Sequence, residues 1–188
     1  MAYYTNEELR RIGFHYLGED VRLSKNASIY NPSFISLGDH CRIDDFCVLS
    51  PGDKGISIGK YVHIGVHSTL IGQGKITLQN YCNISGRVSI YSSNDDYSGE
   101  WMTNPTVPPQ YTNVLSQDIV VKKHTIVGVG SVILPGVTIG EGCAIGTLSL
   151  VKKDLEPYGV YGGIPAKRLK DRNKKLFELE KEFEQGVA

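Results

Sequence analysis

The stretch from Ile119 to Val151, IVVKKHTIVGVGSVILPGVTIGEGCAIGTLSLV, carries a β-branched apolar residue at every sixth position. These anchor residues are Val121, Val127, Ile133, Ile139, Ile145 and Val151. A smaller or second apolar residue stands two positions before each anchor: Ile119, Thr125, Ser131, Val137, Cys143 and Ser149. An α-helix repeats every 3.6 residues and a strand every two, so neither sustains a period of six. The pattern predicts a parallel β-helix, in which each six-residue segment forms one short strand and one corner and the anchors stack inside a prism.

The same period runs through the earlier part of the chain. Its anchors are Leu23 and Ile29, followed by three triplets: Leu37, Ile43 and Leu49; Ile58, Ile64 and Leu70; Leu78, Ile84 and Ile90. The triplets are separated by steps of nine and eight residues instead of six. Three segments therefore make one triangular coil, and extra residues recur at one corner. We predict about five full coils with partial ends, stacked at the β spacing of roughly 4.8 Å.

Helical segments are predicted at both ends, where an open stack of coils needs capping. Thr5 and Glu8 form a capping-box pattern that starts a helix over residues 5–13. Apolar residues at helical spacing predict a second helix over about 166–184. The expected organisation is an N-terminal helical cap over 1–20, a β-helix domain over 21–165 with an inserted loop at 92–118, and a C-terminal helix over 166–188.

Composition narrows the class of protein. The chain has 188 residues, enough for one domain, with 20 basic and 20 acidic residues. This balance gives no reason to expect nucleic acid or an anionic membrane as a partner. No apolar run has the roughly 18 residues of a membrane span, and the N-terminus lacks a signal-peptide pattern, so we expect a cytoplasmic protein. All four cysteines precede an anchor by two positions, which predicts buried free thiols: Cys41, Cys47, Cys82 and Cys143.

The longest loss of the six-residue pattern lies between Ile90 and Ile119. This segment contains the single tryptophan, Trp101, and several prolines and tyrosines. A long insertion without a repeat is usually functional or disordered, and its aromatic and proline content favours an ordered arm. We expect the arm to cover a site or to contact a neighbouring subunit.

Two phrases, SVILPGVTIGEG at 131–142 and SLVKKDLEPYGVYGGIPAKRLK at 149–170, closely resemble the hexapeptide-repeat acyltransferases. The resemblance covers residues 29–170 approximately. It implies a left-handed parallel β-helix that works as a homotrimer, with sites between adjacent subunits, an acyl-CoA cosubstrate and no metal. The GxPA phrase is most similar to the branch that acylates sugars.

The phrase IYSSND at 90–95 aligns with the position where sugar O-acetyltransferases carry a catalytic histidine, and it places Asp95 there. The phrases DDYSG and MTNPTVP look more like the N-acyltransferases of nucleotide-linked 4-amino-4,6-dideoxyhexoses, which serve surface polysaccharide (lipopolysaccharide) biosynthesis. A neutral amine attacks a thioester unaided and needs only positioning and a proton acceptor, so a carboxylate suits it better than it suits a hydroxyl. The resemblance therefore implies a sugar N-acyltransferase with acetyl as the expected acyl group and Asp95 as a catalytic residue.

Further site residues are expected from the same resemblance and from their places in the repeat. Glu100 is a second candidate acid, His67 is the reserve base, and Ser85 is a candidate hydrogen-bond donor. Asn94, Asp96 and Trp101 complete the expected substrate-binding set. The acyl-CoA is expected along an edge of the coil, with His124 facing that edge, and its contacts are Gly128, Val129, Thr147, Lys152, Lys153, Lys167 and Lys170.

Other functions remain open from the residues alone. A sugar O-acetyltransferase could use His67 as its base. A non-catalytic β-helix scaffold is a second alternative, in which Asp95 is a turn former and the terminal lysines are a solvated face. A zinc enzyme of the carbonic anhydrase type is disfavoured, because the outward histidines do not form a three-ligand pattern.

Overall fold

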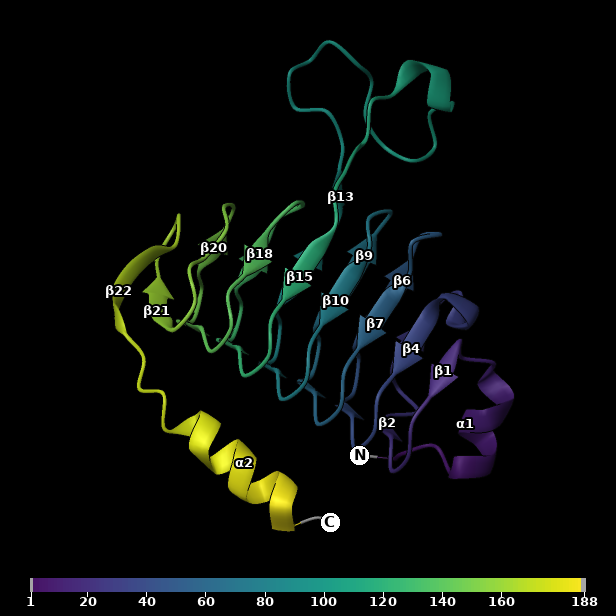
Figure 1. The fold of residues 1–188 in the computed structure, drawn as a ribbon. Coiled ribbons are helices and arrows are strands. Elements are labelled where there is room, and N and C mark those ends of the chain that lie inside the picture. The colour runs from purple at the N-terminus through teal and green to yellow at the C-terminus, as the bar shows by residue number, and fades with distance from the viewer. Residues whose placement is uncertain (1, 187–188) are drawn as a thin grey trace.

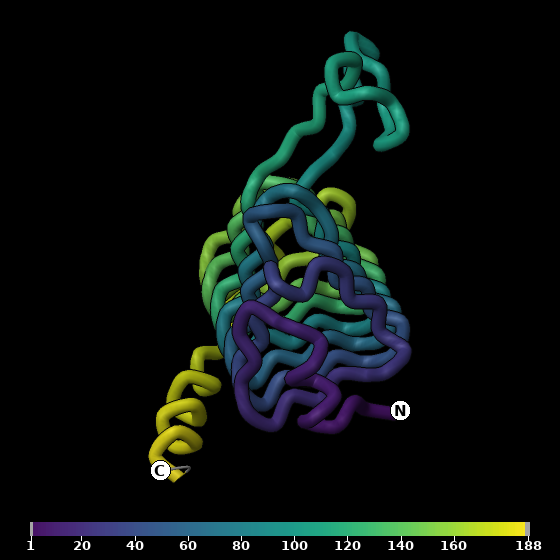
Figure 2. Tube along the Cα trace, turned by 90° about the vertical axis from the view of Figure 1, so that its right-hand side faces the viewer, coloured from purple at the N-terminus to yellow at the C-terminus, as the bar shows by residue number. Residues whose placement is uncertain are grey.

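The protein forms a parallel β-helix in which three sheets enclose a triangular prism (Figures 1 and 2). The structure is a computed structural model that describes residues 2–186. The first sheet contains β1 (Tyr16–Leu17), β4 (Ile35–Leu37), β7 (Ile56–Ile58), β10 (Ile76–Leu78), β15 (Ile119–Val121) and β18 (Thr138–Ile139). The second contains β2 (Arg22–Leu23), β5 (Arg42–Ile43), β8 (His63–Ile64), β11 (Asn83–Ile84), β16 (Ile126–Val127), β19 (Ala144–Ile145), β21 (Gly159–Gly162) and β22 (Lys167–Asp171). The third contains β3 (Ser28–Ile29), β6 (Val48–Pro51), β9 (Thr69–Gly72), β12 (Ser89–Tyr91), β17 (Val132–Ile133) and β20 (Leu150–Val151).

Successive strands visit the three sheets in turn, which confirms the triangular coil. Over residues 2–186 the first and third sheets each have six strands, so the prism has six complete coils and a partial seventh. The first coil is complete because β1 pairs in parallel with β4, although the repeat in the sequence is clear only from Leu23 onward. The corners between the sheets form three edges. We call them the 1/2, 2/3 and 3/1 edges, after the sheets that each edge joins.

The predicted anchors fill the core. All six between Val121 and Val151 are at most 3% exposed. The residues two positions earlier are buried as well, and the polar side chains of Thr125, Ser131 and Cys143 donate to carbonyl oxygens of the neighbouring coil. The Ser131 hydroxyl, for example, donates to the Gly146 carbonyl at 3.0 Å. The anchors thus fill the interior, while the small polar residues satisfy backbone groups that burial would otherwise leave unpaired.

The four cysteines are free and buried, as predicted. Burial raises the pKa of Cys41 and Cys47 to about 11 and that of Cys82 to about 12. Thiols with such pKa values stay protonated at neutral pH and are poor nucleophiles. They act as small core residues.

The N-terminal helix is present as α1 (Asn6–Ile12), and the predicted capping box is confirmed. The Glu8 amide donates to the Thr5 hydroxyl, while the Thr5 amide donates to the Glu8 carboxylate. Gly13 ends the helix in the left-handed conformation, with φ 84°. Within residues 2–186, no helix is both long and apolar enough to cross a membrane.

The prediction of a helix starting near residue 166 is wrong at its N-terminal part. Lys167–Asp171 form β22, which pairs antiparallel with β21. The helix α2 begins at Leu176 and extends to Gly186. The unpaired edge of β21 at the end of the stack accepts this strand, and the backbone hydrogen bonds outweigh the local helical preference. Positions 187 and 188 of the expected C-terminal segment lie outside the described residues.

The helix α2 folds back along the prism (Figure 1). It lies on the 1/2 edge, which carries a column of stacked rings. Its rings are His40, Tyr61, Tyr81 and His124, with centroid distances of 4.5, 5.4 and 4.9 Å. Phe183 and Phe177 of α2 contact these rings edge-on. The helix therefore spans several coils and joins the C-terminal end of the prism to its middle.

Candidate functional site

The 2/3 edge brings together several of the expected site residues on successive coils. Ser85 follows β11, and its amide donates to the Val127 carbonyl at 3.0 Å on the next coil. Gly128 follows β16, and its amide donates to the Ile145 carbonyl at 2.8 Å. A Cβ on Gly128 would lie 2.6 Å from the Thr147 amide nitrogen, so this close approach of two coils requires glycine. Ser85, Gly128, Val129 and Thr147 therefore form one line along this edge.

His67 lies on the same 2/3 edge, one coil before Ser85. It has φ 61°, and its ring stacks on Phe46 with centroids 4.9 Å apart. Among the described residues no carboxylate pairs with its ring. The structure thus places the reserve base beside Ser85 along the edge, and not beside Asp95.

The arm leaves the prism at the 3/1 edge (Figure 2). Its base is a short antiparallel pair, β13 (Ser93–Asn94) with β14 (Leu115–Ser116), and its outer part includes a 3₁₀ turn, η2 (Pro109–Tyr111). The buried Ser92 hydroxyl donates to the Gly74 carbonyl at 2.7 Å, and the Gln117 amide donates to the Ser92 carbonyl at 3.0 Å. These bonds close the base of the arm, so the residues just beyond it start from a fixed position.

Asp95 lies directly after β13, in a cleft of about 590 Å³ at the base of the arm. The cleft is also lined by Asn94, Gln73 and Tyr91, and by Val114, which directly precedes β14. Among residues 2–186, the Asp95 carboxylate has no hydrogen-bond or ion-pair partner. A carboxylate that faces a cleft without a partner is available to bind or deprotonate an ammonium group.

The neighbouring acid has a different environment. The Asp96 carboxylate accepts hydrogen bonds from the Ser98 hydroxyl and the Gly99 amide, both at 2.9 Å. Partial burial alone would raise the pKa of Asp96, but these hydrogen bonds outweigh it and lower the pKa. Asp96 thus shapes the turn in the arm. Glu100 and Trp101 lie further out on the exposed part of the arm, beyond the residues that line the cleft.

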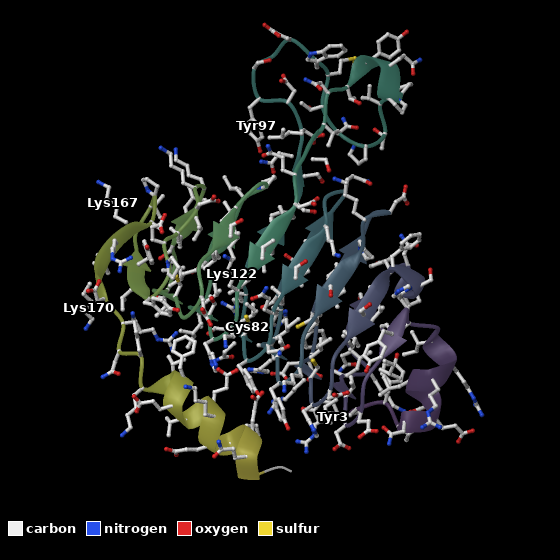
Figure 3. The ribbon with its side chains drawn as sticks, in the orientation of Figure 1. Tyr3, Cys82, Tyr97, Lys122, Lys167 and Lys170 are labelled. Atoms are coloured by element: carbon white, nitrogen blue, oxygen red, sulfur yellow. The ribbon has the colours of Figure 1, made fainter. Side chains whose placement is uncertain are left out.

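Four lysines expected to bind the CoA phosphates are exposed and take part in no ion pair within the described chain: Lys152, Lys153, Lys167 and Lys170. Lys152 and Lys153 follow β20 on the 3/1 edge. Residues 163–166 run against β20, where the Ala166 amide donates to the Leu150 carbonyl at 2.8 Å. Lys167 therefore starts β22 near the C-terminal end of the 2/3 edge, and Figure 3 shows Lys167 and Lys170 projecting outward from β22.

The structure separates the expected site into two groups. Ser85, Gly128, Val129 and Thr147 lie on the 2/3 edge, and Lys167 lies near its C-terminal end. Asn94 and Asp95 lie on the 3/1 edge, across the width of the third sheet, and Lys152 and Lys153 follow β20 on that same edge. His124 lies on neither edge. Its ring is on the 1/2 edge, where Nε2 is 2.8 Å from the Glu180 carboxylate of α2, so the expectation that it faces the acyl-CoA does not fit the structure.

Two features went unnoticed in the sequence. Gln73 and Tyr91 line the cleft with Asp95, and the repeat could have indicated them, because they flank the same corner on consecutive coils. The second is His63, whose ring bonds to both Asp44 and Asn83. Among residues 2–186, no three His, Cys, Asp or Glu side chains are gathered in a way that could hold a metal ion.

Comparison with known proteins gives relatives over the full length of the chain. The chain is 52% identical over 183 residues to the dTDP-4-amino-4,6-dideoxy-D-glucose acyltransferase of Escherichia coli, covering 97% of this chain and 95% of that protein. A weaker similarity, 24% over 168 residues, links it to the galactoside O-acetyltransferase of E. coli, covering 88% and 79% of the two chains. No family model matches.

Among solved structures, the chain is similar to AntD, an N-acyltransferase from Bacillus cereus, in complex with dTDP and 3-hydroxybutyryl-CoA. The two chains are 44% identical with a TM-score of 0.95, and the match covers 100% of this chain and 99% of AntD. A variant of AntD is also known in complex with dTDP-4-amino-4,6-dideoxyglucose and coenzyme A.

Proposed function

This chain belongs to the hexapeptide-repeat acyltransferase family that includes the dTDP-4-amino-4,6-dideoxy-D-glucose acyltransferase of E. coli, and on that premise we propose that it transfers an acyl group from acyl-CoA to the 4-amino group of dTDP-4-amino-4,6-dideoxyglucose. The observation that carries the proposal is the unpartnered Asp95 carboxylate in the cleft at the base of the arm. Relatives that share the fold over the whole chain bind both a dTDP-linked amino sugar and coenzyme A.

The reaction needs a proton acceptor near the amine, and a carboxylate is a strong enough base for this role. The neutral amine attacks the thioester carbonyl, the C–S bond breaks, and the CoA thiolate leaves and takes up a proton. Asp95 attracts the ammonium form of the acceptor and accepts the proton that the amine must lose. A sugar hydroxyl would demand a better base, for which histidine is the usual residue.

The 2/3 edge offers the acyl-CoA side of the reaction. We propose that backbone groups around Gly128, Val129 and Thr147 bond the pantetheine arm, with Ser85 at its thioester end. The lysines at 152, 153, 167 and 170 then pair with the CoA phosphates, since unpaired cations suit a multiply anionic ligand. Acetyl is the proposed acyl group.

Two copies of the chain would complete each site. Ser85 and Asp95 lie on different edges of one prism, so we propose a homotrimer in which the 3/1 edge of one subunit faces the 2/3 edge of the next. AntD variants have been made at a serine and at an aspartate ten positions further along its chain. Ser85 and Asp95 are also ten positions apart (95 − 85), which supports assigning them a shared role. We further propose that the product serves surface polysaccharide synthesis from a cytoplasmic pool of nucleotide sugars.

The test follows release of free thiol from acyl-CoA by the purified protein. Transfer is expected with dTDP-4-amino-4,6-dideoxyglucose, and not with the counterpart that carries a hydroxyl in place of the amine. Acetyl-CoA and 3-hydroxybutyryl-CoA are compared as donors, and a strong preference for the second would overturn the acetyl assignment. Turnover with the hydroxyl sugar and none with the amino sugar would contradict the proposal of N-acylation.

The role of Asp95 is tested by Asp95→Asn, which keeps the shape and removes the charge. We expect kcat/KM to fall by about 100-fold or more, the size of a lost general base. Asp53→Asn is the matched control, because Asp53 is another exposed acid of the 3/1 edge and lies outside the cleft that Asp95 lines. Equal effects of the two substitutions would remove Asp95 from the mechanism.

A further inference from the structure

A polar network crosses three coils on the outer face of the second sheet, next to Ser85. The Arg42 Nε atom donates to Asp44 Oδ1 at 2.7 Å. His63 Nε2 lies 2.9 Å from Asp44 Oδ2, and His63 Nδ1 lies 3.0 Å from Asn83 Oδ1. The network therefore runs along the stack from Arg42 to Asn83. It ends two residues before Ser85.

A contribution to the stability of the fold does not explain well why this network is present. Asp44 is only 4% exposed. Burial alone would raise the pKa of Asp44, but hydrogen bonds from His63 and Arg42 outweigh it and lower the pKa. A buried charge that needs several partners is weak evidence for added stability, because desolvation offsets the attraction. On the C-terminal side of Asn83, the same column of outward positions is apolar, with Ile126, Ala144 and Val160.

The network fixes the orientation of the Asn83 amide. His63 Nδ1 lies at the oxygen of the Asn83 amide, while His63 Nε2 lies at the Asp44 carboxylate, so the ring is held between the two side chains. The Asn83 oxygen is thereby used by His63, and its NH₂ group is left to donate. Within residues 2–186, the Asn83 side chain has no other hydrogen-bond partner.

The free amide lies beside the proposed acyl-transfer site. Alternate residues of a strand face the same side, so Asn83 and Ser85 both face outward, about 7 Å apart along the chain. The proposed path of the acyl-CoA runs from Ser85 toward the C-terminal end, over Gly128 and Thr147. Asn83 lies off that path, on the face of the second sheet. Asn83 is therefore placed to contact the amino sugar and not the acyl-CoA along its proposed path.

We propose that Asn83, held by His63 and Asp44, is a specificity-determining residue that donates a hydrogen bond to the ring hydroxyl adjacent to the reacting amine of the sugar. This inference rests on the proposed function. In a 4-amino-4,6-dideoxyhexose that hydroxyl is on C3, and C5, the other neighbour of the amine-bearing carbon, bears a methyl group and the ring oxygen but no hydroxyl. A hydrogen bond at C3 orients the amine toward the thioester. His63 and Asp44 are positioning residues, because they act through Asn83.

The test combines variants with an altered substrate. Asn83→Ala is expected to lower kcat/KM for the amino sugar by about tenfold, the size of one lost hydrogen bond, and to leave KM for acyl-CoA unchanged. With the wild-type protein, kcat/KM for a sugar nucleotide that lacks the C3 hydroxyl should also be about tenfold lower than for the amino sugar. With that altered substrate, Asn83→Ala should lower kcat/KM no further. His63→Ala should weaken sugar use in the same direction and add nothing to Asn83→Ala. The matched control is Thr77→Ala, which alters an outward residue of the same coil on the first sheet.

Three results would overturn the inference: unchanged kinetics in Asn83→Ala, an effect on acyl-CoA alone, or effects of Asn83→Ala and His63→Ala that multiply. Equilibrium binding of the sugar nucleotide is measured in parallel for the wild type and Asn83→Ala, and equal affinities would also overturn it. Because this comparison measures binding alone, it tests the role of Asn83 even if a variant shows no turnover. A wild-type protein that binds the sugar but transfers no acyl group would instead contradict the proposed function.

Discussion

The C-terminal helix α2 is held on the prism by ring contacts and by ion pairs of Glu180 and Glu184, and Phe177→Ala tests the contribution of the rings. The Phe177 ring meets His124 and Tyr158 edge-on, with centroid distances of 5.0 and 5.5 Å, and the Lys123 ammonium lies 5.4 Å from its centroid. Edge-to-face pairs contribute about 0.5–1.5 kcal/mol each and an exposed cation–π contact about 0.5–1 kcal/mol. With the lost apolar burial, the substitution should weaken docking of α2 by about 3 kcal/mol.

The effect should stay local, since α2 has eleven residues and a helix of this length is marginal without tertiary contacts. Hydrogen exchange measured by mass spectrometry should show peptides of α2 exchanging about a hundredfold faster, while peptides of β15–β20 keep their protection. Leu179→Ala is the control, because Leu179 is an apolar residue of the same helix that is 51% exposed. Equal acceleration in the prism, or equal effects of both variants, would refute the reasoning.

Three further predictions concern assembly, the core and pH. Mixing Ser85→Ala and Asp95→Asn proteins, each weak alone, should restore a fraction of acyl transfer, because one interface of a mixed trimer then has both native residues; mixtures no more active than their parts would contradict a shared site. Ile133→Ala removes a fully buried anchor and should lower the free energy of unfolding by about 2–5 kcal/mol in denaturant titration. Burial alone would raise the pKa of Glu180, but hydrogen bonds from His124 and Lys123 outweigh it and lower the pKa below 4.5. The Glu180 carboxylate therefore stabilises the docking of α2 above pH 4.5, and this stabilisation fades as pH falls through the lowered pKa. In Glu180→Gln, hydrogen exchange of α2 should lose this part of its pH dependence.

The sequence was sufficient to predict the prism because each coil repeats the same physical requirement. Every inward position needs an apolar residue that fits the triangle, so Ile133 or Leu49 could be assigned without any partner being known. The first coil was harder to recognise, since Leu17 stands alone among polar neighbours. Strand β22 was misjudged because its alternation of lysine, arginine and leucine carries little periodicity, and only the open edge of β21 decides its conformation.

The candidate site divides in the same way. Asp95 was found because the phrase IYSSND resembles the phrase that carries the catalytic histidine in sugar O-acetyltransferases, at the point where the repeat is interrupted, and Ser85 because it stands at a corner. The network of Asp44, His63 and Asn83 escaped notice, since its members are about 20 positions apart and come together only when coils stack in register. Local patterns indicate which way a side chain points, whereas hydrogen bonds across coils depend on the exact number of residues in each turn.

The closure of the arm at its base has a consequence for how such proteins diversify. The bond from the Gln117 amide to the Ser92 carbonyl returns the chain to the prism at the point where it left. The number of residues between them is therefore uncoupled from the register of every later coil. Insertions, deletions or transplanted segments in the arm should therefore alter the cleft that Asp95 lines, which we propose as the acceptor site, while the coils and the 2/3 edge stay intact.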